Sequence, residues 1–232
     1  KDLIDDLATR FEILDFTPNR VAGLARLKTF AGRAGVLYDR CRNYDLGAEQ
    51  RANVSALSPW IRHRLITELE VLEVILEQHS FQTAERFVHE VFWRTYFKGW
   101  LEQHPGVWSS YQVGLRRQIK SVGKDRRLAA NYTRAMVGET GIDCFDAWAD
   151  ELVRTGYLHN HARMWFASIW IFTLQLPWEL GADFFLRHLI DGDPASNTLA
   201  WRWVAGIQTK GRPYIARASN IAKFTNQKFC PM

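Results

Sequence analysis

Residues 191–204 read Asp-Gly-Asp-Pro-Ala-Ser-Asn-Thr-Leu-Ala-Trp-Arg-Trp-Val. This segment combines two carboxylates, one amide and two tryptophans, in a chain that has ten tryptophans in all. A tryptophan can pack in a core, stack on a flat ligand or carry an electron, and a cluster beside fixed carboxylates indicates a large, flat, redox-active ligand. A tryptophan-rich core is the alternative, and for any single tryptophan it is the commoner explanation. Other segments must therefore decide between the two.

The composition is that of one globular domain. The 232 residues, 47% hydrophobic and 24% charged, can bury a full core. The net charge of +5 is compatible with a polyanionic partner without requiring one. The three cysteines are far apart and the histidines show no metal-ligand spacing, so we expect no disulfide framework, no metal site and no iron–sulfur cluster. We see neither a membrane-length apolar run nor a signal peptide, and we predict a cytoplasmic protein.

Hydrophobic spacing predicts an all-α fold, and the leucines of residues 60–79 recur at intervals of four, three and four. The predicted helices cover residues 18–35, 60–79, 83–103, 127–137, 143–155, 159–176, 181–190 and about 196–206. Residues 36–59 are predicted to be irregular, and residues 106–127 an exposed basic loop with a short helix. A basic, loop-like tail is expected from about residue 210. The sequence has no GxGxxG motif and no alternating strand–helix pattern, which argues against a Rossmann-type nucleotide site.

Two predicted helices carry candidate binding residues. Glu90, Trp93 and Phe97 fall at positions i, i+3 and i+7, on one helix face. Arg163 could pair with Asp191, because a guanidinium makes planar, bidentate contact with a carboxylate and can lie flat against an aromatic ring. A surface glutamate beside a core tryptophan, and a structural salt bridge, are the alternatives.

Two weaker features could bind phosphate. Residues 55–59, Ser-Ala-Leu-Ser-Pro, form a turn that enters a helix, where hydroxyl and free backbone N–H groups suit a phosphate. Tyr38 and Arg42 lie four residues apart, and Arg42 could reach a phosphate. A routine serine cap and a solvated arginine are the alternatives.

Taken in chain order, these segments resemble the helical FAD-binding domain of the photolyase/cryptochrome family. The matching segments are Tyr38-x-x-x-Arg42, Ser55-x-Leu57-Ser58, Glu90 to Phe97, Thr155 to Met164, Leu189 to Asp193, and Asn197 to Trp203. Together they span roughly residues 20–220. The resemblance implies one helical domain over residues 1–232 that holds FAD in a U-shaped conformation.

The resemblance also implies which residues contact FAD. These are Tyr38, Ser55, Ala56, Leu57, Ser58, Phe87, Arg163, Asp191, Asp193 and Asn197. Tyr38 and the serine turn would hold the phosphates, while Arg163 would lie against the isoalloxazine and pair with Asp191. Asn197 would face flavin N5, and an asparagine at this position is characteristic of photolyases, which favours repair over signalling.

The family further implies a pocket for UV-damaged DNA and a chain of electron carriers. The residues matching the DNA side are Arg42, Glu90, Trp93, Asn160, His161, Met164 and Trp203. Most of them would surround a flipped-out pyrimidine dimer, and Glu90 would hydrogen-bond the damaged bases and stabilise the dimer radical anion. Trp201 and Trp178 match the proximal and middle members of the family's photoreduction chain.

The sequence departs from the family pattern at several positions. The family's N-terminal α/β antenna domain has no counterpart in this sequence, so the chain is either a naturally short, antenna-less member or a trimmed one, and we expect no second chromophore. Ala56 and His161 stand where the family often has arginine. The distal tryptophan is not at its usual place, near Arg126, and Trp108 or Tyr132 could substitute for it.

The function implied by the resemblance is light-dependent repair of cyclobutane pyrimidine dimers, by electron transfer from photoexcited reduced FAD. A weakly basic DNA face makes a preference for single strands plausible, because phosphate contacts dominate affinity for DNA. A cryptochrome-like blue-light photoreceptor and a flavin-free helical module that binds nucleic acid are the alternatives.

Overall fold

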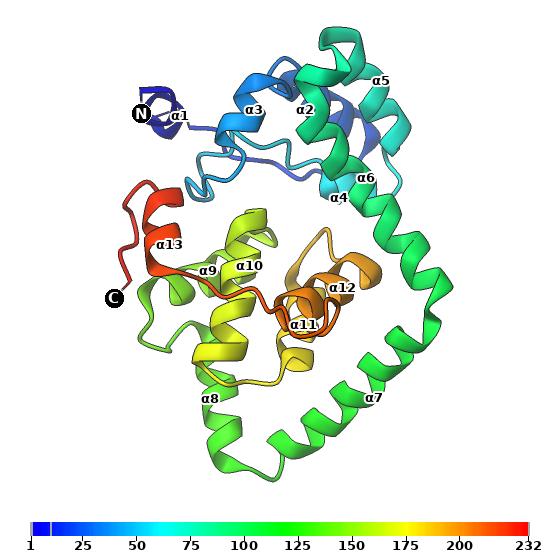
Figure 1. Cartoon of the computed structure of the whole chain (residues 1–232). Coiled ribbons are helices and arrows are strands. Elements are labelled where there is room, and N and C mark those ends of the chain that lie inside the picture. The colour runs from blue at the N-terminus through cyan, green and yellow to red at the C-terminus, as the bar shows by residue number, and fades with distance from the viewer. Residues whose placement is uncertain (1, 10, 232) are drawn as a thin grey trace. The chain divides into compact units, whose positions relative to one another are not determined.

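The computed structural model describes residues 2–9 and 11–231. Over these residues the regular secondary structure is helical, apart from one isolated β-bridge between Glu12 and Gln50. The elements are α1 (Asp2–Thr9), α2 (Arg20–Ala31), α3 (Val36–Cys41), α4 (Ser58–Arg62), α5 (Glu68–Gln78), α6 (Phe81–Gln103), α7 (Pro105–Val122), α8 (Arg126–Val137), α9 (Asp143–Thr155), α10 (Asn160–Ser168), the π-helix η1 (Ile169–Thr173), α11 (Trp178–His188), α12 (Pro194–Val204) and α13 (Ala218–Phe224) (Figure 1). The predicted all-α class is confirmed. None of the described helices combines the length and apolar composition that crossing a membrane requires.

The helices divide into two compact units. The first unit comprises Lys1–Tyr96 and the second Phe97–Met232, so the boundary falls within α6. A single domain over residues 1–232 stays a prediction.

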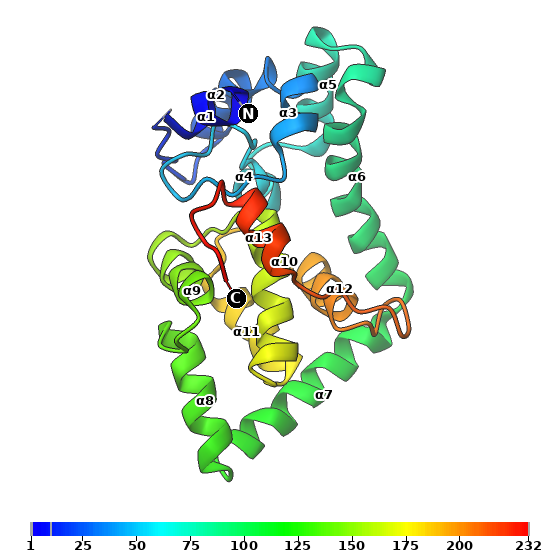
Figure 2. The ribbon, with the colours of Figure 1, turned by 60° about the vertical axis from the view of Figure 1, so that its left-hand side comes forward.

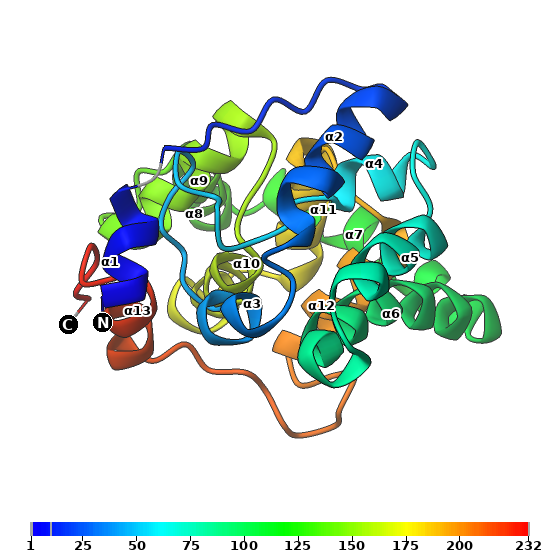
Figure 3. The same cartoon turned by 90° about the horizontal axis from the view of Figure 1, so that it is seen from above.

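In the first unit, α2 packs against α5 around a core that includes Leu27, Phe30 and Ile75. Figure 3 shows the helices of this unit from above. The start of α5 is a capping box, in which Thr67 accepts a hydrogen bond from the Glu70 N–H while the Glu70 carboxylate accepts one from the Thr67 N–H. The prediction of one helix over residues 60–79 was wrong, because α4 ends before this cap begins a new helix.

A buried arginine organises the loop before α4. Arg26 Nε donates to the Ser55 carbonyl and Nη2 donates to the Val54 carbonyl, both at 2.7 Å. Its Nη1 lies 2.8 Å from Glu12 Oε1. The arginine therefore satisfies carbonyl groups that helices or strands would otherwise pair, and its charge is balanced by a carboxylate.

The second unit is built around stacked aromatic rings. The Phe145 and Phe166 rings lie 4.2 Å apart at 18°, and the Trp148 and Trp165 rings lie 5.5 Å apart at 24°. Within this unit α11 packs against α7 and α12 (Figure 2). Aromatic packing supplies large apolar burial with defined ring geometry.

Three predicted irregular segments contain helices. Residues 106–127 are mostly α7, whose basic residues occupy the exposed face while Tyr111 and Gly114 are buried. Residues 36–59 contain α3, which buries Tyr38 and Cys41. The tail beyond residue 210 contains α13, anchored by the buried Ile221. In each case a few buried positions fix a helix that the polar composition concealed.

The predicted helix over residues 159–176 changes geometry within its length. It is α-helical to Ser168 and then continues as the π-helix η1, in which the Leu174 N–H donates to the Ile169 carbonyl at 2.9 Å. The wider turn rotates the chain beyond Ser168 and sets the direction of the Trp170 ring. π-helices of this kind are rare and often mark functional sites.

Candidate functional site

The start of α12 fixes the segment that carries most of the candidate residues. Asp193 caps the helix by accepting hydrogen bonds from the Ala195 and Ser196 N–H groups, both at 3.0 Å, and Pro194 occupies the first turn. Lys98 Nζ lies 3.7 Å from the same carboxyl group of Asp193. The cap therefore sets the rotation of α12 and the directions of Asn197, one turn on, and of the tryptophans beyond.

The two tryptophans of α12 point to different surroundings, as their spacing of two residues predicts. Trp201 is 2% exposed and Trp203 is 38% exposed. The Trp201 ring packs edge-on against Phe185, with the ring centroids 5.1 Å apart. One helix thus provides both a buried indole and an accessible one.

The predicted pair of Arg163 and Asp191 is present. Arg163 Nη2 lies 2.9 Å from Asp191 Oδ2, and Arg163 Nε donates to the Leu158 carbonyl at 2.9 Å. The guanidinium also lies over the Tyr157 ring, 5.1 Å from its centroid. These contacts hold a planar cation in one orientation beside a buried carboxylate.

Asn197 is buried, and its amide is oriented by the backbone. Its Nδ2 donates to the Ala182 carbonyl at 2.8 Å. With the amide nitrogen held there, Oδ1 is the atom that can accept a hydrogen bond from a ligand.

A cavity of about 160 Å³ within the second unit brings these side chains together. Eight residues implicated by the sequence line it, namely Asn160, Arg163, Met164, Asp191, Asp193, Asn197, Trp201 and Trp203. A guanidinium, two carboxylates and an amide among apolar walls are suited to a flat heterocycle with several nitrogen and oxygen atoms. The donor set therefore fits the ring system of a flavin.

Other cavity-lining residues were not identified from the sequence as ligands. Phe97 is predicted only on the face of Glu90 and Trp93, and Leu189 only as the start of a matching segment, whereas nothing in the sequence indicates a role for Phe185 or Ser196. Their role depends on contacts between helices that are distant in sequence. The same is true of Lys98, whose carboxylate partner lies on the loop before α12.

Trp178 and His161 do not line this cavity, although both were predicted to have functional roles. Trp178 packs on Tyr111, with ring centroids 5.5 Å apart. His161 stacks on Trp165 at 4.2 Å and also contacts Phe224 of α13. The proposed DNA contact of His161 and the electron-carrier role of Trp178 stay predictions.

The first unit carries the candidate phosphate and aromatic residues. Tyr38 and Phe87 are both buried and pack edge to face, with centroids 5.2 Å apart. In the serine turn, Ala56 has a φ of 49°, a left-handed conformation that non-glycine residues seldom adopt. Arg26 holds the carbonyl of Ser55 in this turn. Strained backbone of this kind persists where the surroundings fix it, often at binding sites.

Two residues predicted to act on the DNA side pair with each other. Arg42 Nη1 lies 2.6 Å from Glu90 Oε1, and both side chains are partly exposed. The guanidinium that was expected at a DNA phosphate therefore contacts the carboxylate that was expected at the damaged bases. Trp93, near the end of the same unit, is exposed and packs edge-on against Tyr96 at 5.4 Å.

The fold and the cavity define an all-α cofactor-binding domain. The chain belongs to the family described as the FAD binding domain of DNA photolyase, whose model matches residues 87–229. This match includes the whole cavity of the second unit together with Phe87, Glu90 and Trp93 of the first.

Named relatives and solved structures agree with this family. The chain is 34% identical over 205 residues to a deoxyribodipyrimidine photo-lyase of Streptomyces griseus, covering 86% of this chain and 43% of that protein. It is 32% identical over 208 residues to a cryptochrome DASH of Natronomonas pharaonis, covering 86% and 42%. A class III photolyase from Agrobacterium tumefaciens matches with a TM-score of 0.73 and 26% identity, covering 97% of this chain and 45% of that one. A Synechocystis cryptochrome matches with a TM-score of 0.73 and 25% identity, covering 94% and 46%. The chain thus spans less than half the length of these relatives.

Proposed function

We propose that this chain binds FAD and uses it to split cyclobutane pyrimidine dimers in UV-damaged DNA under light. The observation that carries the proposal is the cavity in the second unit, which gathers an oriented guanidinium, two carboxylates and an amide. Arg163, Asp191, Asp193 and Asn197 are the residues proposed to hold the flavin end. Tyr38, Phe87 and the turn from Ser55 through Ala56 and Leu57 to Ser58 are the first-unit residues proposed for the cofactor.

Bound FAD would supply a light-driven one-electron donor. The chain's own contribution is to bind and orient. In this proposal Asn197 Oδ1 would accept a hydrogen bond from flavin N5–H, because Nδ2 donates to the Ala182 carbonyl. Trp203 and Met164 would offer an apolar wall for the two joined pyrimidines of the dimer, and Asn160 lines the same cavity. Glu90 is proposed to hydrogen-bond the damaged bases, and Trp93 to stack beside them.

The charge distribution supports a preference for single-stranded DNA. Arg42 is engaged with Glu90, and His161 packs against the rings of Trp165 and Phe224. Each reduces the number of cations available for phosphates, and duplex affinity depends strongly on that number. Binding to single-stranded and duplex dimer-containing oligonucleotides at several salt concentrations tests this, with a shallow salt dependence expected.

The function is tested by illuminating FAD-loaded, reduced protein with thymine-dimer oligonucleotides and measuring dimer loss against a dark control. Dimer loss only in the light supports the proposal. A protein that binds FAD and undergoes photoreduction without dimer loss would instead support the photoreceptor alternative, which the DASH and Synechocystis cryptochrome relatives favour. A protein that binds DNA but no flavin would support the third alternative.

Three further predictions concern the location of the protein and its other possible cofactors. A cytoplasmic location, the lack of a second chromophore and the lack of an iron–sulfur cluster stay predictions.

A further inference from the structure

A row of aromatic rings leads away from the cavity of the second unit. Trp201 lines the cavity, and its ring meets that of Trp170 edge-on, with centroids 6.2 Å apart at 86°. Trp170 in turn meets Tyr132 of α8, with centroids 5.9 Å apart at 84°. The two indoles are fully buried and Tyr132 is half-buried. Rings in contact form the shortest steps for electron transfer, whose rate falls steeply with distance.

The middle ring of this row is held from several sides. Trp170 lies in the π-helix η1, and its Nε1 donates to the Pro177 carbonyl at 2.9 Å. Gly181 of α11 lies against both indoles, since a Cβ there would fall 2.3 Å from the Trp201 ring and 2.9 Å from Trp170 Nε1. A side chain at position 181 would therefore displace one of the two rings. The absence of one lets Trp201 and Trp170 approach each other.

Only the end of the row offers a place to release a proton. Trp201 Nε1 is buried and has no hydrogen-bond partner among the described residues, and Trp170 Nε1 faces a neutral carbonyl. An oxidised indole at either position would keep its proton and take an electron from its neighbour. The Tyr132 hydroxyl, by contrast, lies in a solvent-exposed hydrogen bond, where it accepts from Arg187 Nη2 at 3.1 Å.

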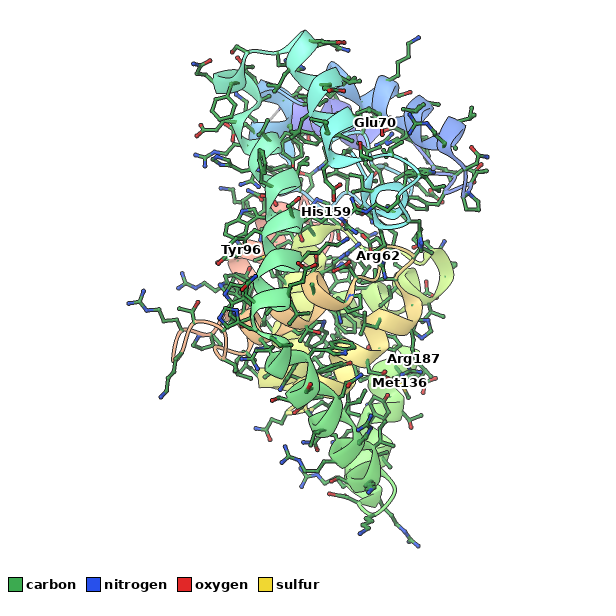
Figure 4. All side chains as sticks on the ribbon, turned by 90° about the vertical axis from the view of Figure 1, so that its right-hand side faces the viewer. Arg62, Glu70, Tyr96, Met136, His159 and Arg187 are labelled. Atoms are coloured by element: carbon green, nitrogen blue, oxygen red, sulfur yellow. The ribbon has the colours of Figure 1, made fainter. Side chains whose placement is uncertain are left out.

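The surroundings of the Tyr132 hydroxyl include charges of both signs. Arg187 also pairs through Nε with Asp183 Oδ2 at 2.8 Å, and its Nη2 lies 3.9 Å from Met136 Sδ, the two side chains that are labelled next to each other in Figure 4. Burial raises the pKa of Tyr132, and the nearby Arg187 partly offsets this, so the phenol is protonated at neutral pH. Its oxidation would therefore release a proton.

A second aromatic row begins at Trp178 and provides a comparison. Trp178 contacts Tyr111, which contacts Trp108, with centroids 5.5 Å and 5.2 Å apart. The Tyr111 hydroxyl is buried without a hydrogen-bond partner among the described residues, and burial raises its pKa strongly. Because no described group accepts a hydrogen bond from this phenol, Tyr111 has no direct acceptor for its proton and is less suited than Tyr132 to hold a stable radical.

We propose that Tyr132 is the terminal electron donor of this chain and that it acts through Trp170 on Trp201. The proposal rests on the FAD site proposed above. With FAD bound and excited by light, Trp201 would supply one electron to the cofactor, Trp170 would supply one to the oxidised Trp201, and Tyr132 would supply one to the oxidised Trp170. Tyr132 releases its phenolic proton to water and becomes a neutral radical. An added thiol then returns a hydrogen atom to the tyrosyl oxygen and is itself oxidised to a thiyl radical.

The test compares matched variants of the FAD-loaded protein. Tyr132→Phe removes only the hydroxyl of a half-buried ring, and Tyr111→Phe is its control in the other row. Trp170→Phe removes the oxidisable middle ring and so interrupts the proposed path. Trp148→Phe is its control, because Trp148 is equally buried in the same core outside the row. Thermal unfolding identifies any variant that fails to fold.

The readout is the electron paramagnetic resonance signal of oxidised protein that has been illuminated and then frozen. The wild type and both controls are expected to show a tyrosyl radical whose spectrum narrows when the tyrosine rings are deuterated. Tyr132→Phe and Trp170→Phe are expected to lose that signal and to slow flavin photoreduction in the presence of thiol. An undiminished tyrosyl signal in Tyr132→Phe, or its loss in Tyr111→Phe alone, would overturn the assignment. Protein that binds no FAD, seen from its visible spectrum, would overturn the proposed function itself.

Discussion

The interiors of the two units of this chain are built from different kinds of side chain. In the first unit, arginines enter the interior and satisfy loop carbonyls, as Arg26 does, or pair with a buried carboxylate, as Arg51 does with Asp45 at 2.9 Å. In the second unit the interior is aromatic, and of the ten tryptophans only Trp60 and Trp93 lie outside this unit. The first unit is thus suited to shaping loops and turns, while the second is suited to stacking on a ring system and moving electrons.

The difference has a consequence for acid stability. Burial alone would raise the pKa of Glu12, but hydrogen bonds from Arg33 and the charge of Arg26 hold it below its ordinary value of 4.5. The stacked rings at the centre of the second unit carry no charge to titrate. Acid should therefore weaken the first unit before the core of the second.

The largest effect is expected from removing the buried arginine of the first unit. Arg26→Met leaves the Ser55 and Val54 carbonyls without their donor and Glu12 without its closest cation. Breaking a buried charge network of this kind costs about 3–5 kcal/mol, and the measurement is chemical unfolding. Arg20→Met, which removes an exposed pair with Glu70, is the control and should change the free energy of unfolding far less. Equal effects of the two variants would show that the buried arginine stabilises the first unit no more than an exposed one.

The next effect concerns repair rather than stability. Glu90→Ala should slow dimer splitting by roughly ten- to a hundredfold, because a hydrogen bond to a charged group contributes about 1.5–3 kcal/mol. FAD should remain bound, since Glu90 is assigned to the DNA side. The same variant frees Arg42 from its ion pair, so duplex binding should tighten. Unchanged turnover would exclude Glu90 from the reaction.

A smaller effect is expected from filling the contact between α11 and the aromatic row. Gly181→Ala places a methyl group against the Trp201 ring, and overpacking of this kind costs about 1–3 kcal/mol. Photoreduction should slow as well, because the rings must separate. Gly99→Ala in α6 is the control, since nothing lies within 4 Å of a Cβ there, and it should be neutral or slightly stabilising. Thermal unfolding of the two variants measures the difference.

The smallest effect is the dependence on pH. Because the folded pKa of Glu12 is lower than that of the unfolded chain, its contribution to stability is complete above about pH 4.5 and is lost as the pH falls through the folded value. Chemical unfolding between pH 7 and pH 3 should show this loss in the wild type. Glu12→Gln should be less stable at pH 7 and should lose less on acidification, and a parallel pH profile for both proteins would contradict the assignment.

Much of the helical pattern was visible in the sequence, but not the helices whose buried residues are few. Residues 127–137 and 143–155 coincide closely with α8 and α9, because each has a clear cap or apolar face. By contrast, residues 106–127 are predicted from the sequence as an exposed basic loop with a short helix, because the basic residues of α7 conceal its buried face around Tyr111. The spacing of apolar residues therefore predicts a helix correctly where the helix has a cap or an apolar face within its own sequence.

Some residues of the candidate site could be predicted from the sequence and others could not. The pair of Arg163 and Asp191 followed from chemistry and resemblance, because both residues sit in recognisable motifs. Trp170 carried no signal, since its position depends on a π-helix and on a glycine of another helix. The pairing of Arg42 with Glu90 could not be predicted, because the two residues are 48 positions apart and only tertiary packing brings their side chains together.

Binding of a flavin in the cavity of the second unit can be measured from the visible absorption spectrum of the purified, FAD-loaded protein after desalting. The wild type should retain the flavin bands, and so should Arg154→Met, which removes an exposed pair with Asp150 on α9. Arg163→Met should lose the bands while remaining folded, because it removes the guanidinium that lines the cavity and pairs with Asp191. A colourless wild type, or an Arg163→Met variant that holds FAD as tightly as the wild type, would show that this cavity does not bind the flavin as proposed.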